Sequence, residues 1–328
     1  MRRKKTVKRV LLSLLIFVIS FSLISMLVSA MFYGVFFPRR DTAEDYTLHY
    51  SGIDSSSYPR ERVRFLSGDR TLTGYCYPCD DPSGLIVISG GFGEVCDAHL
   101  GETMAFVDNG FSVFCFDCTG VGESEGNGTV GLAQPSLDLR AALMYIADDP
   151  ALNRLPVFLY GHSAGGYAAA TCADQPCVKA AVVLSGFESP TLLMRESARN
   201  YVGVFADIEY PFLSLQNDIV FGGQGSKSAS DCLKKAGIPA LIYEGSDDRT
   251  IPPCARLSRY LSDSSDITVT ICDKPPKNGH SGIWLTEDAL ACRTNDSGNP
   301  DPVAANEVDR EFLRVIMDFY RKSLEENN

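Results

Sequence analysis

Apolar residues follow two different patterns along the 328-residue chain. Residues 10–37 form an unbroken run of 28 uncharged residues dominated by Leu, Ile, Val and Phe. A helix of this length would extend about 42 Å, at about 1.5 Å per residue, and so exceed the roughly 30 Å hydrocarbon layer of a bilayer. We therefore predict a transmembrane helix over residues 10–37. The rest of the chain contains only short apolar segments.

The charges on either side of the apolar run predict its orientation. Residues 1–9 carry six Lys and Arg side chains and no acidic one, whereas the segment after the run soon becomes acidic. The positive-inside rule makes residues 1–9 a cytoplasmic stub of a single-pass protein in the cell membrane, with the remaining chain outside. A cleaved signal peptide, with Val28-Ser29-Ala30 as its cleavage site, is the alternative. The length of the run favours an uncleaved signal anchor, and both interpretations export the remaining chain.

After residue 60, short apolar runs rich in β-branched and aromatic residues predict strands, and helical patterns separate the later ones. We predict a polar linker over residues 38–60 and one domain over residues 61–328. The alternation predicts an α/β class, with a mainly parallel eight-stranded sheet flanked by helices and an antiparallel edge. The predicted strands are 62–67, 71–77, 84–90, 112–117, 156–161, 179–185, 239–244 and 267–272. The predicted helices are 94–108, 136–148, 163–173, 253–262 and 304–323.

Composition restricts the partners of the exported part. The chain has a net charge of −11, and because the N-terminal stub carries +6, the remainder carries −17. Such an acidic chain lacks the basic surface that binding to nucleic acid requires. Its hydrophobic content of 45% excludes a disordered polar chain.

The motif G-x-S-x-G occurs twice, at residues 161–165 and 122–126. The first match follows an apolar strand and opens an Ala-rich helical stretch, which is the context of a nucleophilic serine on a sharp strand-to-helix turn. The second match has no strand directly before it. We therefore predict that Ser163 is the nucleophile and that Ser124 is a loop residue.

Two further segments support a family resemblance. Residues 110–113 (GFSV) and 117–126 (DCTGVGESEG) are similar to the G-[YF]-x-V…D-x-R-G-x-G-x-S-x-G segment of the α/β-hydrolase family, with Thr119 where Arg is usual. The likeness covers roughly residues 60–325. It implies an α/β-hydrolase fold and a serine hydrolase of the esterase, lipase or serine-aminopeptidase-like branch.

A catalytic serine needs a neighbouring base, which is itself oriented by an acid. Of the four histidines, His280 follows the last predicted strand in a loop that resembles the family's G-H loop, and it fits the chain order Ser, acid, His. The other three lie in the linker (His49), in the first predicted helix (His99) and beside the serine (His162). Residues 245–252 resemble the family's G-x-x-D-x-x-V-P loop, which selects Asp248 over Asp247.

The strand and loop at residues 85–93 resemble the segment that leads to the family's H-G-x loop, with Gly90 in place of His. By position, the backbone N–H groups of Phe92 and Ala164 would form the oxyanion hole. No phosphate-binding or dinucleotide-binding motif is present, and we expect no cofactor and no metal.

The family often carries a lid where residues 188–236 interrupt the alternation of strands and helices. Apolar side chains of this segment would form a wall above Ser163 that suits an acyl chain or an aromatic group. These side chains are Leu192, Leu193, Met194, Tyr201, Val204, Phe205, Tyr210, Phe212 and Leu213.

The sequence thus predicts a membrane-anchored, extracytoplasmic serine hydrolase that cleaves an ester in a small-molecule or lipid-like acyl substrate. Peptidase, amidase or acyltransferase activity would use the same three residues. A non-catalytic binding protein on the hydrolase fold is an alternative of a different class. A third alternative is a redox or metal protein, because the chain has eleven cysteines. The Cys-x-x-Cys pairs at residues 76–79 and 115–118 have the spacing of a zinc or redox site, although no second feature of the sequence supports such a site.

Overall fold

The computed structural model describes residues 2–41, 43–262, 265–294 and 300–325. Met1 of the predicted stub, residue 42 of the predicted linker, and residues 263–264, 295–299 and 326–328 of the predicted domain lie outside the described residues. The description below concerns the remaining positions.

Eight strands of the described residues form one sheet, in the order β1-β2-β4-β3-β5-β6-β7-β8. The pairs β1–β2 and β2–β4 are antiparallel and all the others are parallel. This confirms the mainly parallel sheet with an antiparallel edge, and each predicted strand boundary lies within one residue of the observed one. The strands are β1 (Glu61–Ser67), β2 (Arg70–Tyr77), β3 (Leu85–Ser89), β4 (Ser112–Phe116), β5 (Val157–His162), β6 (Val178–Leu184), β7 (Ala240–Gly245) and β8 (Ile267–Cys272).

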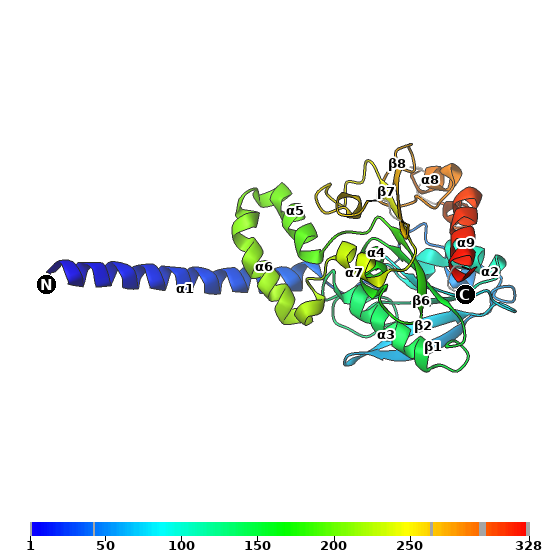
Figure 1. Cartoon of the computed structure of the whole chain (residues 1–328), viewed down its shortest axis with the longest axis horizontal. Coiled ribbons are helices and arrows are strands. Elements are labelled where there is room, and N and C mark those ends of the chain that lie inside the picture. The colour runs from blue at the N-terminus through cyan, green and yellow to red at the C-terminus, as the bar shows by residue number, and fades with distance from the viewer. Residues whose placement is uncertain (1, 42, 263–264, 295–299, 326–328) are drawn as a thin grey trace.

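Helices cover both faces of the sheet, as Figure 1 shows. Alternate residues of the buried strands supply two apolar layers: Val87 of β3 packs toward α3, α4 and α7, whereas Ile86 and Ile88 pack toward α2, α8 and α9. This alternation is why the central strands consist almost entirely of apolar residues. The helices are α1 (Arg2–Phe36), α2 (Leu100–Asp108), α3 (Gln134–Asp148), α4 (Ala164–Cys172), α5 (Pro190–Val202), α6 (Phe205–Phe221), α7 (Ala229–Ala236), α8 (Glu287–Thr294) and α9 (Arg310–Glu325).

Three of the predicted helices differ from the structure. The predicted helix 94–108 is a 3-10 turn, Cys96–His99, followed by α2. Residues 253–262 form turns and only a short 3-10 segment, Leu257–Arg259. Two prolines precede the segment, and the Arg256 guanidinium donates hydrogen bonds to the carbonyl oxygens of Ile251 and Asp248, so tertiary contacts override the helical pattern. The predicted helix 304–323 is split into a 3-10 turn, Ala304–Asn306, and α9.

Helix α1 projects from the domain (Figure 1) and contains the apolar run. It includes the basic residues of the predicted stub, from Arg2 onward. Over Lys4–Phe36 it is long and apolar enough to cross a membrane, with a mean hydropathy of 2.7 and only 6% of its most apolar window buried. A signal sequence would have the same properties.

The segment predicted as a linker is packed against the domain. Backbone hydrogen bonds join Phe37 to Thr129 and join Arg40 to Gly120 and Gly122, at 2.9–3.0 Å. Leu48 is buried in the apolar layer of α2 and α9. Most residues of this segment are exposed to solvent, as its polar composition suggests, but these contacts attach it to the domain.

Residues 188–236 form α5, α6, a short 3-10 turn and α7. Helix α7 packs against α4 and belongs to the body of the domain. Helices α5 and α6 form a hairpin that stands apart from the sheet, where α6 crosses α1 (Figure 1). Of the nine residues expected to form an apolar wall, Leu193, Met194 and Leu213 are buried. Several residues at and near the hairpin turn are exposed instead: Tyr201, Val204 and Phe205.

Candidate active site

Ser163 lies on a sharp turn between β5 and α4. Its backbone adopts φ 54° and ψ −115°, a strained conformation for a residue with a side chain. A Cβ added at Gly161 would lie 2.2 Å from the carbonyl oxygen of Gly165, and one at Gly165 would lie 1.9 Å from that of Ser89. The turn therefore requires both glycines, and the G-x-S-x-G pattern has a steric cause.

The three candidate catalytic side chains come together, although they lie on three separate loops. His280 Nε2 is 2.9 Å from Ser163 Oγ, and His280 Nδ1 is 2.8 Å from Asp248 Oδ2. The Asp248 side chain is buried, and that of His280 is 15% exposed. The arrangement can pass a proton from the serine hydroxyl to the imidazole while the carboxylate fixes the ring.

The acid loop is held close to the histidine loop. A Cβ at Gly245 would lie 2.1 Å from the carbonyl oxygen of Gly279, so only glycine allows this approach. Asp248 Oδ1 accepts hydrogen bonds from the backbone N–H groups of Thr250 and Ile251 at 2.8 and 2.9 Å. Burial disfavours the carboxylate, but His280 and these two N–H donors outweigh it and lower the pKa of Asp248.

Of the two expected oxyanion donors, Ala164 directly follows the serine and Phe92 lies in the loop after β3. Ala164 begins α4, so its N–H is a first-turn donor without an acceptor inside the helix. Phe92 lies in the turn from Gly91 to Glu94, which is closed by a backbone hydrogen bond of 3.1 Å. Within the described residues, we find no hydrogen bond from the Phe92 N–H.

A second group of polar residues, which the sequence did not reveal, lies behind the first. The Glu94 carboxylate accepts a hydrogen bond from the Gly91 N–H at 2.5 Å and lies 3.0 Å from His99 Nε2 and 3.5 Å from His162 Nδ1. His162 Nε2 is 3.3 Å from the carbonyl oxygen of His280. The turn from Gly91 to Glu94, which carries the expected donor Phe92, is called the oxyanion loop below. Through His162, Glu94 connects this loop to the loop that carries His280.

The close approach of the side chains in this group shifts the pKa values of Glu94 and His99. Burial disfavours the charged form of Glu94, but His162 and His99 lower its pKa well below the usual 4.5. Burial likewise disfavours protonated His99, but Glu102 and Glu94 raise its pKa well above 6.5. His99 and Glu102 are both buried, with their side chains 2.9 Å apart. The pair is a buried ion pair at the base of the site.

Ser185 is a further residue that the sequence did not reveal. It has φ 48°, and its hydroxyl donates a hydrogen bond of 2.6 Å to the carbonyl oxygen of His280. A serine at the carboxyl end of β6 has no distinguishing pattern, so only the position of the strand could have identified it.

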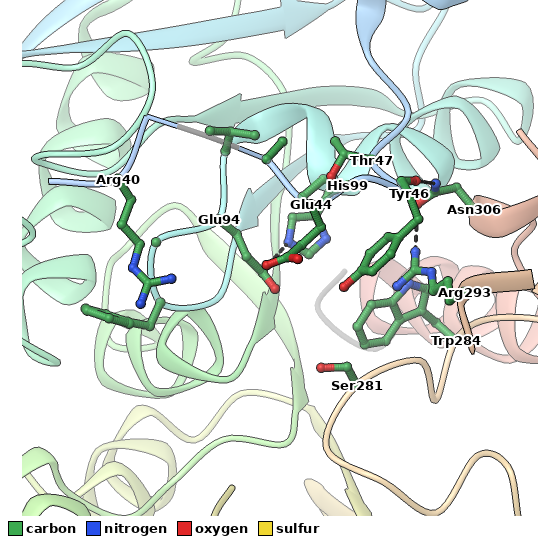
Figure 2. A pocket seen from close by; sticks show the side chains of 15 residues that line it. Arg40, Glu44, Tyr46, Thr47, Glu94, His99, Ser281, Trp284, Arg293 and Asn306 are labelled. Carbon is green, nitrogen blue, oxygen red and sulfur yellow. Dashed lines mark hydrogen bonds and ion pairs between the residues drawn. The ribbon is translucent and has the colours of Figure 1, made fainter. Parts of the chain in front are cut away.

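A pocket of about 160 Å³ opens beside the oxyanion loop. Figure 2 shows Arg40 at one side, Trp284 and Arg293 at the other, and Glu94 and His99 between them. Ser281, which follows the candidate histidine, also lines this pocket. Most of the lining residues are polar or charged, and none of Ser163, Asp248 and His280 is among them.

The other residues that the sequence singled out take structural positions. Ser124 is buried, and its hydroxyl donates to the carbonyl oxygen of Asp117 at 2.6 Å. The Asp247 side chain is 57% exposed and pairs with Arg249. The His49 side chain is exposed and lies 3.6 Å from Asp97.

The two Cys-x-x-Cys pairs are not assembled into a common site. Cys76 and Cys118 pack on one face of the sheet, whereas Cys115 packs on the other. Burial raises the pKa of the Cys118 thiol well above its usual value, which disfavours the reactive thiolate. In the part of the chain that the structure describes, no group of three or more His, Cys, Asp or Glu residues is arranged to hold a metal ion.

Comparison with known proteins finds one matching family model and several similar folds. A family model described as serine aminopeptidase, S33, matches residues 80–212. No curated protein sequence matches the chain.

Several solved structures share the fold. The chain is similar to an esterase of Pyrococcus furiosus, with a TM-score of 0.58 at 14% identity over 87% of this chain and 98% of the other. It is also similar to the acylaminoacyl peptidase of Pyrococcus horikoshii, with a TM-score of 0.55 at 16% identity over 80% and 41%. The protein Est1E from Butyrivibrio proteoclasticus, whose structure has ferulic acid bound, gives a TM-score of 0.51 at 15% identity over 80% and 98%. The strand order, the serine turn and the likeness to these structures show that the chain has the α/β-hydrolase fold, and residues 80–212 match a family model of that fold.

Proposed function

We propose that this protein is a membrane-anchored serine hydrolase that cleaves an ester outside the cytoplasm by acyl transfer to water. The observation that carries the proposal is the hydrogen-bonded series from Asp248 through His280 to Ser163, with contacts of 2.8 and 2.9 Å. A nucleophile, a base and an orienting acid in this geometry are the requirements for covalent catalysis by serine.

The proposed reaction has two halves. Ser163 Oγ attacks the ester carbonyl carbon while its proton passes to His280 Nε2, and Asp248 stabilises the resulting imidazolium. The N–H groups of Phe92 and Ala164 stabilise the negative charge on the carbonyl oxygen. The alcohol leaves with the proton from His280. Water, activated by His280, then attacks the acyl-serine, releases the acid and restores the serine.

Contacts of α1 with the folded domain support an uncleaved anchor. Ser25 and Ser29 lie upstream of the possible cleavage site at Ala30 and are only 1% and 4% exposed. Ser25 Oγ donates to Glu209 Oε1 at 3.0 Å, and the Phe21 ring packs edge-on against Phe212 at 5.8 Å. A signal peptide removed after Ala30 would forfeit these contacts.

Amide or peptide hydrolysis is the second candidate. It is favoured by the serine-aminopeptidase description of the family model and by the likeness to the acylaminoacyl peptidase. Turnover of an ester and an amide that share one acyl group separates the two, because a peptidase must also protonate an amine leaving group. An ester-to-amide preference that is absent or reversed would favour the peptidase.

Labelling with a fluorophosphonate probe tests the hydrolase. We expect the full chain in detergent to be labelled and Ser163→Ala to lose the label completely. Ser281→Ala is the matched control, since this serine is exposed and adjoins His280. Labelling that persists in Ser163→Ala, or that is absent from folded wild-type protein, would contradict the proposal.

A further inference from the structure

A pocket of about 330 Å³ lies between α1 and the α5–α6 hairpin, outside the site described above. Its volume falls within the range of about 300–1,000 Å³ that is typical of small-molecule sites. Helix α1 contributes Val28, Ser29, Phe32 and Phe36. The opposite wall comes from the hairpin, chiefly Met194, Ala198, Tyr201, Val202, Ala206 and Leu213.

The surface of this pocket is almost wholly apolar, and its two charged residues are paired with other groups, although Glu209 Oε2 is buried without a hydrogen-bond partner in the part of the chain described. Glu209 accepts the hydrogen bond from Ser25, and Arg195 donates two hydrogen bonds to Asp207 at 2.6 and 2.8 Å. The surface that remains for a ligand is therefore hydrocarbon, and it suits an alkyl chain without hydrogen-bonding groups.

The inner wall of the pocket is continuous with the oxyanion loop. Met194 and Leu213 belong to one apolar cluster with Tyr33 and Phe37 of α1 and the segment after it, and Phe92 packs against this cluster. The Phe37 ring meets the Phe92 ring edge-on, with centroids 5.5 Å apart. An alkyl chain in the pocket would therefore lie against the same apolar cluster on which the Phe92 side chain packs.

The outer surface of the hairpin indicates where such a chain comes from. Helix α6 buries Ala206 and Leu213 but leaves Ile208, Leu215 and Ile219 exposed, so it is apolar on both faces. Helix α6 crosses α1 (Figure 1), and α1 also carries many exposed apolar side chains. A bilayer that begins at residue 10 would surround about 20 residues of α1. The hairpin contacts α1 from Phe21 onward, so this contact would begin within the outer part of that bilayer.

We propose that the pocket between α1 and the α5–α6 hairpin binds the acyl chain of a membrane lipid, so that the transmembrane helix forms one wall of the substrate site. The lipid enters sideways from the bilayer and presents its ester carbonyl to Ser163. This inference rests on the proposed function, because it names the substrate class of the same site.

Chain-length dependence tests the pocket. Each methylene buried from water contributes about three- to fourfold to kcat/KM. We expect the full chain in phosphatidylcholine nanodiscs to prefer nitrophenyl octanoate strongly over nitrophenyl acetate. Val28→Trp on α1 and Ala198→Trp on α5 fill the pocket and should lower the octanoate-to-acetate ratio at least tenfold. Taking the ratio within each variant cancels any loss of folded protein.

The matched controls are at Met31, three residues after Val28, and at Asn200, two residues after Ala198. Met31→Trp is on an exposed face of α1, and Asn200→Trp is exposed on α5; neither lines the pocket. Both controls should keep the wild-type ratio. A ratio that is unchanged in Val28→Trp and Ala198→Trp, or that falls equally in all four variants, would overturn the proposal.

A binding experiment separates this inference from the proposed function. In a Ser163→Ala background, a phosphatidylcholine with a diazirine near the end of its acyl chain should cross-link to residues 190–202 in vesicles. The cross-link should fall severalfold with Ala198→Trp and persist with Asn200→Trp. If wild-type protein neither takes up fluorophosphonate nor cleaves acetate, the proposed function fails, whereas equal cross-linking of both variants refutes the pocket alone.

Discussion

At the scale of single residues, the candidate site combines local strain with well-paired polar groups. Ser163 and Ser185 both hold positive φ angles beside the site. Such conformations persist where surrounding contacts fix them, and here the Ser163 N–H donates to the carbonyl oxygen of Leu184 at 2.8 Å. The carboxylates of buried Asp248 and half-buried Glu94 are each paired with imidazole and backbone N–H groups.

The role of Asp248 predicts a large catalytic effect with little structural change. Asp248→Asn keeps an oxygen for the N–H groups of Thr250 and Ile251 but removes the charge that stabilises the imidazolium of His280. We expect kcat to fall about 10³- to 10⁴-fold, measured with a chromogenic ester, while the circular dichroism spectrum is retained. Asp247→Asn is the control and should keep activity near that of the wild type. The reverse result would show that the acid is Asp247.

The buried pair of His99 and Glu102 predicts a pH dependence of stability. Because the pKa of His99 is raised in the folded state, its stabilising contribution is fully present below pH 6.5 and is lost as the pH rises through the folded pKa. Glu102→Gln should lower the pKa of His99, measured by NMR of labelled histidine. It should also reduce the free energy of unfolding at neutral pH by about 3–5 kcal/mol and flatten its decline toward alkaline pH.

Glu123→Gln is the control for that experiment, since Glu123 forms an exposed ion pair with Arg62. It should leave the pKa of His99 unchanged. A His99 pKa that is the same with and without Glu102 would show that the neighbouring carboxylates do not stabilise the charged imidazole.

At the scale of elements, the segment after α1 stabilises the loop that contains Thr119. The Arg39 guanidinium donates hydrogen bonds to the carbonyl oxygens of Gly122, Ser124 and Gly126, at 2.6–2.9 Å. Thr119, which stands where the family usually has Arg, instead hydrogen-bonds Asp138. An arginine from outside the motif therefore binds this loop.

Removal of Arg39 should loosen that loop. Arg39→Ala leaves three carbonyl oxygens without a charged donor, and we expect a loss of about 2–4 kcal/mol in the free energy of unfolding. Limited proteolysis should show faster cleavage within residues 119–128. Arg40→Ala, which removes the neighbouring exposed side chain, is the control, and the protease should cleave it at the wild-type rate. If residues 119–128 are equally protected from the protease in Arg39→Ala and in the wild type, Arg39 does not stabilise this loop.

At the scale of the whole molecule, charge and hydropathy separate the chain into unlike parts. The +6 stub precedes an apolar helix, and the −17 remainder contains the α/β-hydrolase domain. The same helix also packs on the domain, through Tyr33 Oη, which donates to Asn217 Oδ1 at 2.8 Å, and through Ser25. Helix α1 and the domain are therefore in direct contact, and under the proposed anchoring this contact would hold the domain close to the bilayer.

The charge asymmetry predicts the topology of the expressed protein. With a tag at each end, protease added to intact cells should remove the C-terminal tag and spare the N-terminal one. Permeabilised cells, in which both tags should be lost, provide the control. Protection of the C-terminal tag in intact cells would place the domain in the cytoplasm and contradict the proposed localisation.

The sequence alone determined the features that depend on local pattern and chain order. The strands follow from short apolar runs, the turn at Ser163 from its flanking glycines, and the choice of His280 from its place after the last strand. These patterns are readable because backbone geometry imposes them within a few residues.

Tertiary structure alone decided the contacts between distant segments. Glu94 meets His162 across 68 positions of the chain, and Ser25 meets Glu209 across 184. Neither pair has a periodicity or spacing that a linear pattern could reveal, because each contact depends on how separate elements pack. For the same reason, the sequence predicted a linker for the polar segment after α1. In the structure, hydrogen bonds of the first residues of this segment attach it to the domain.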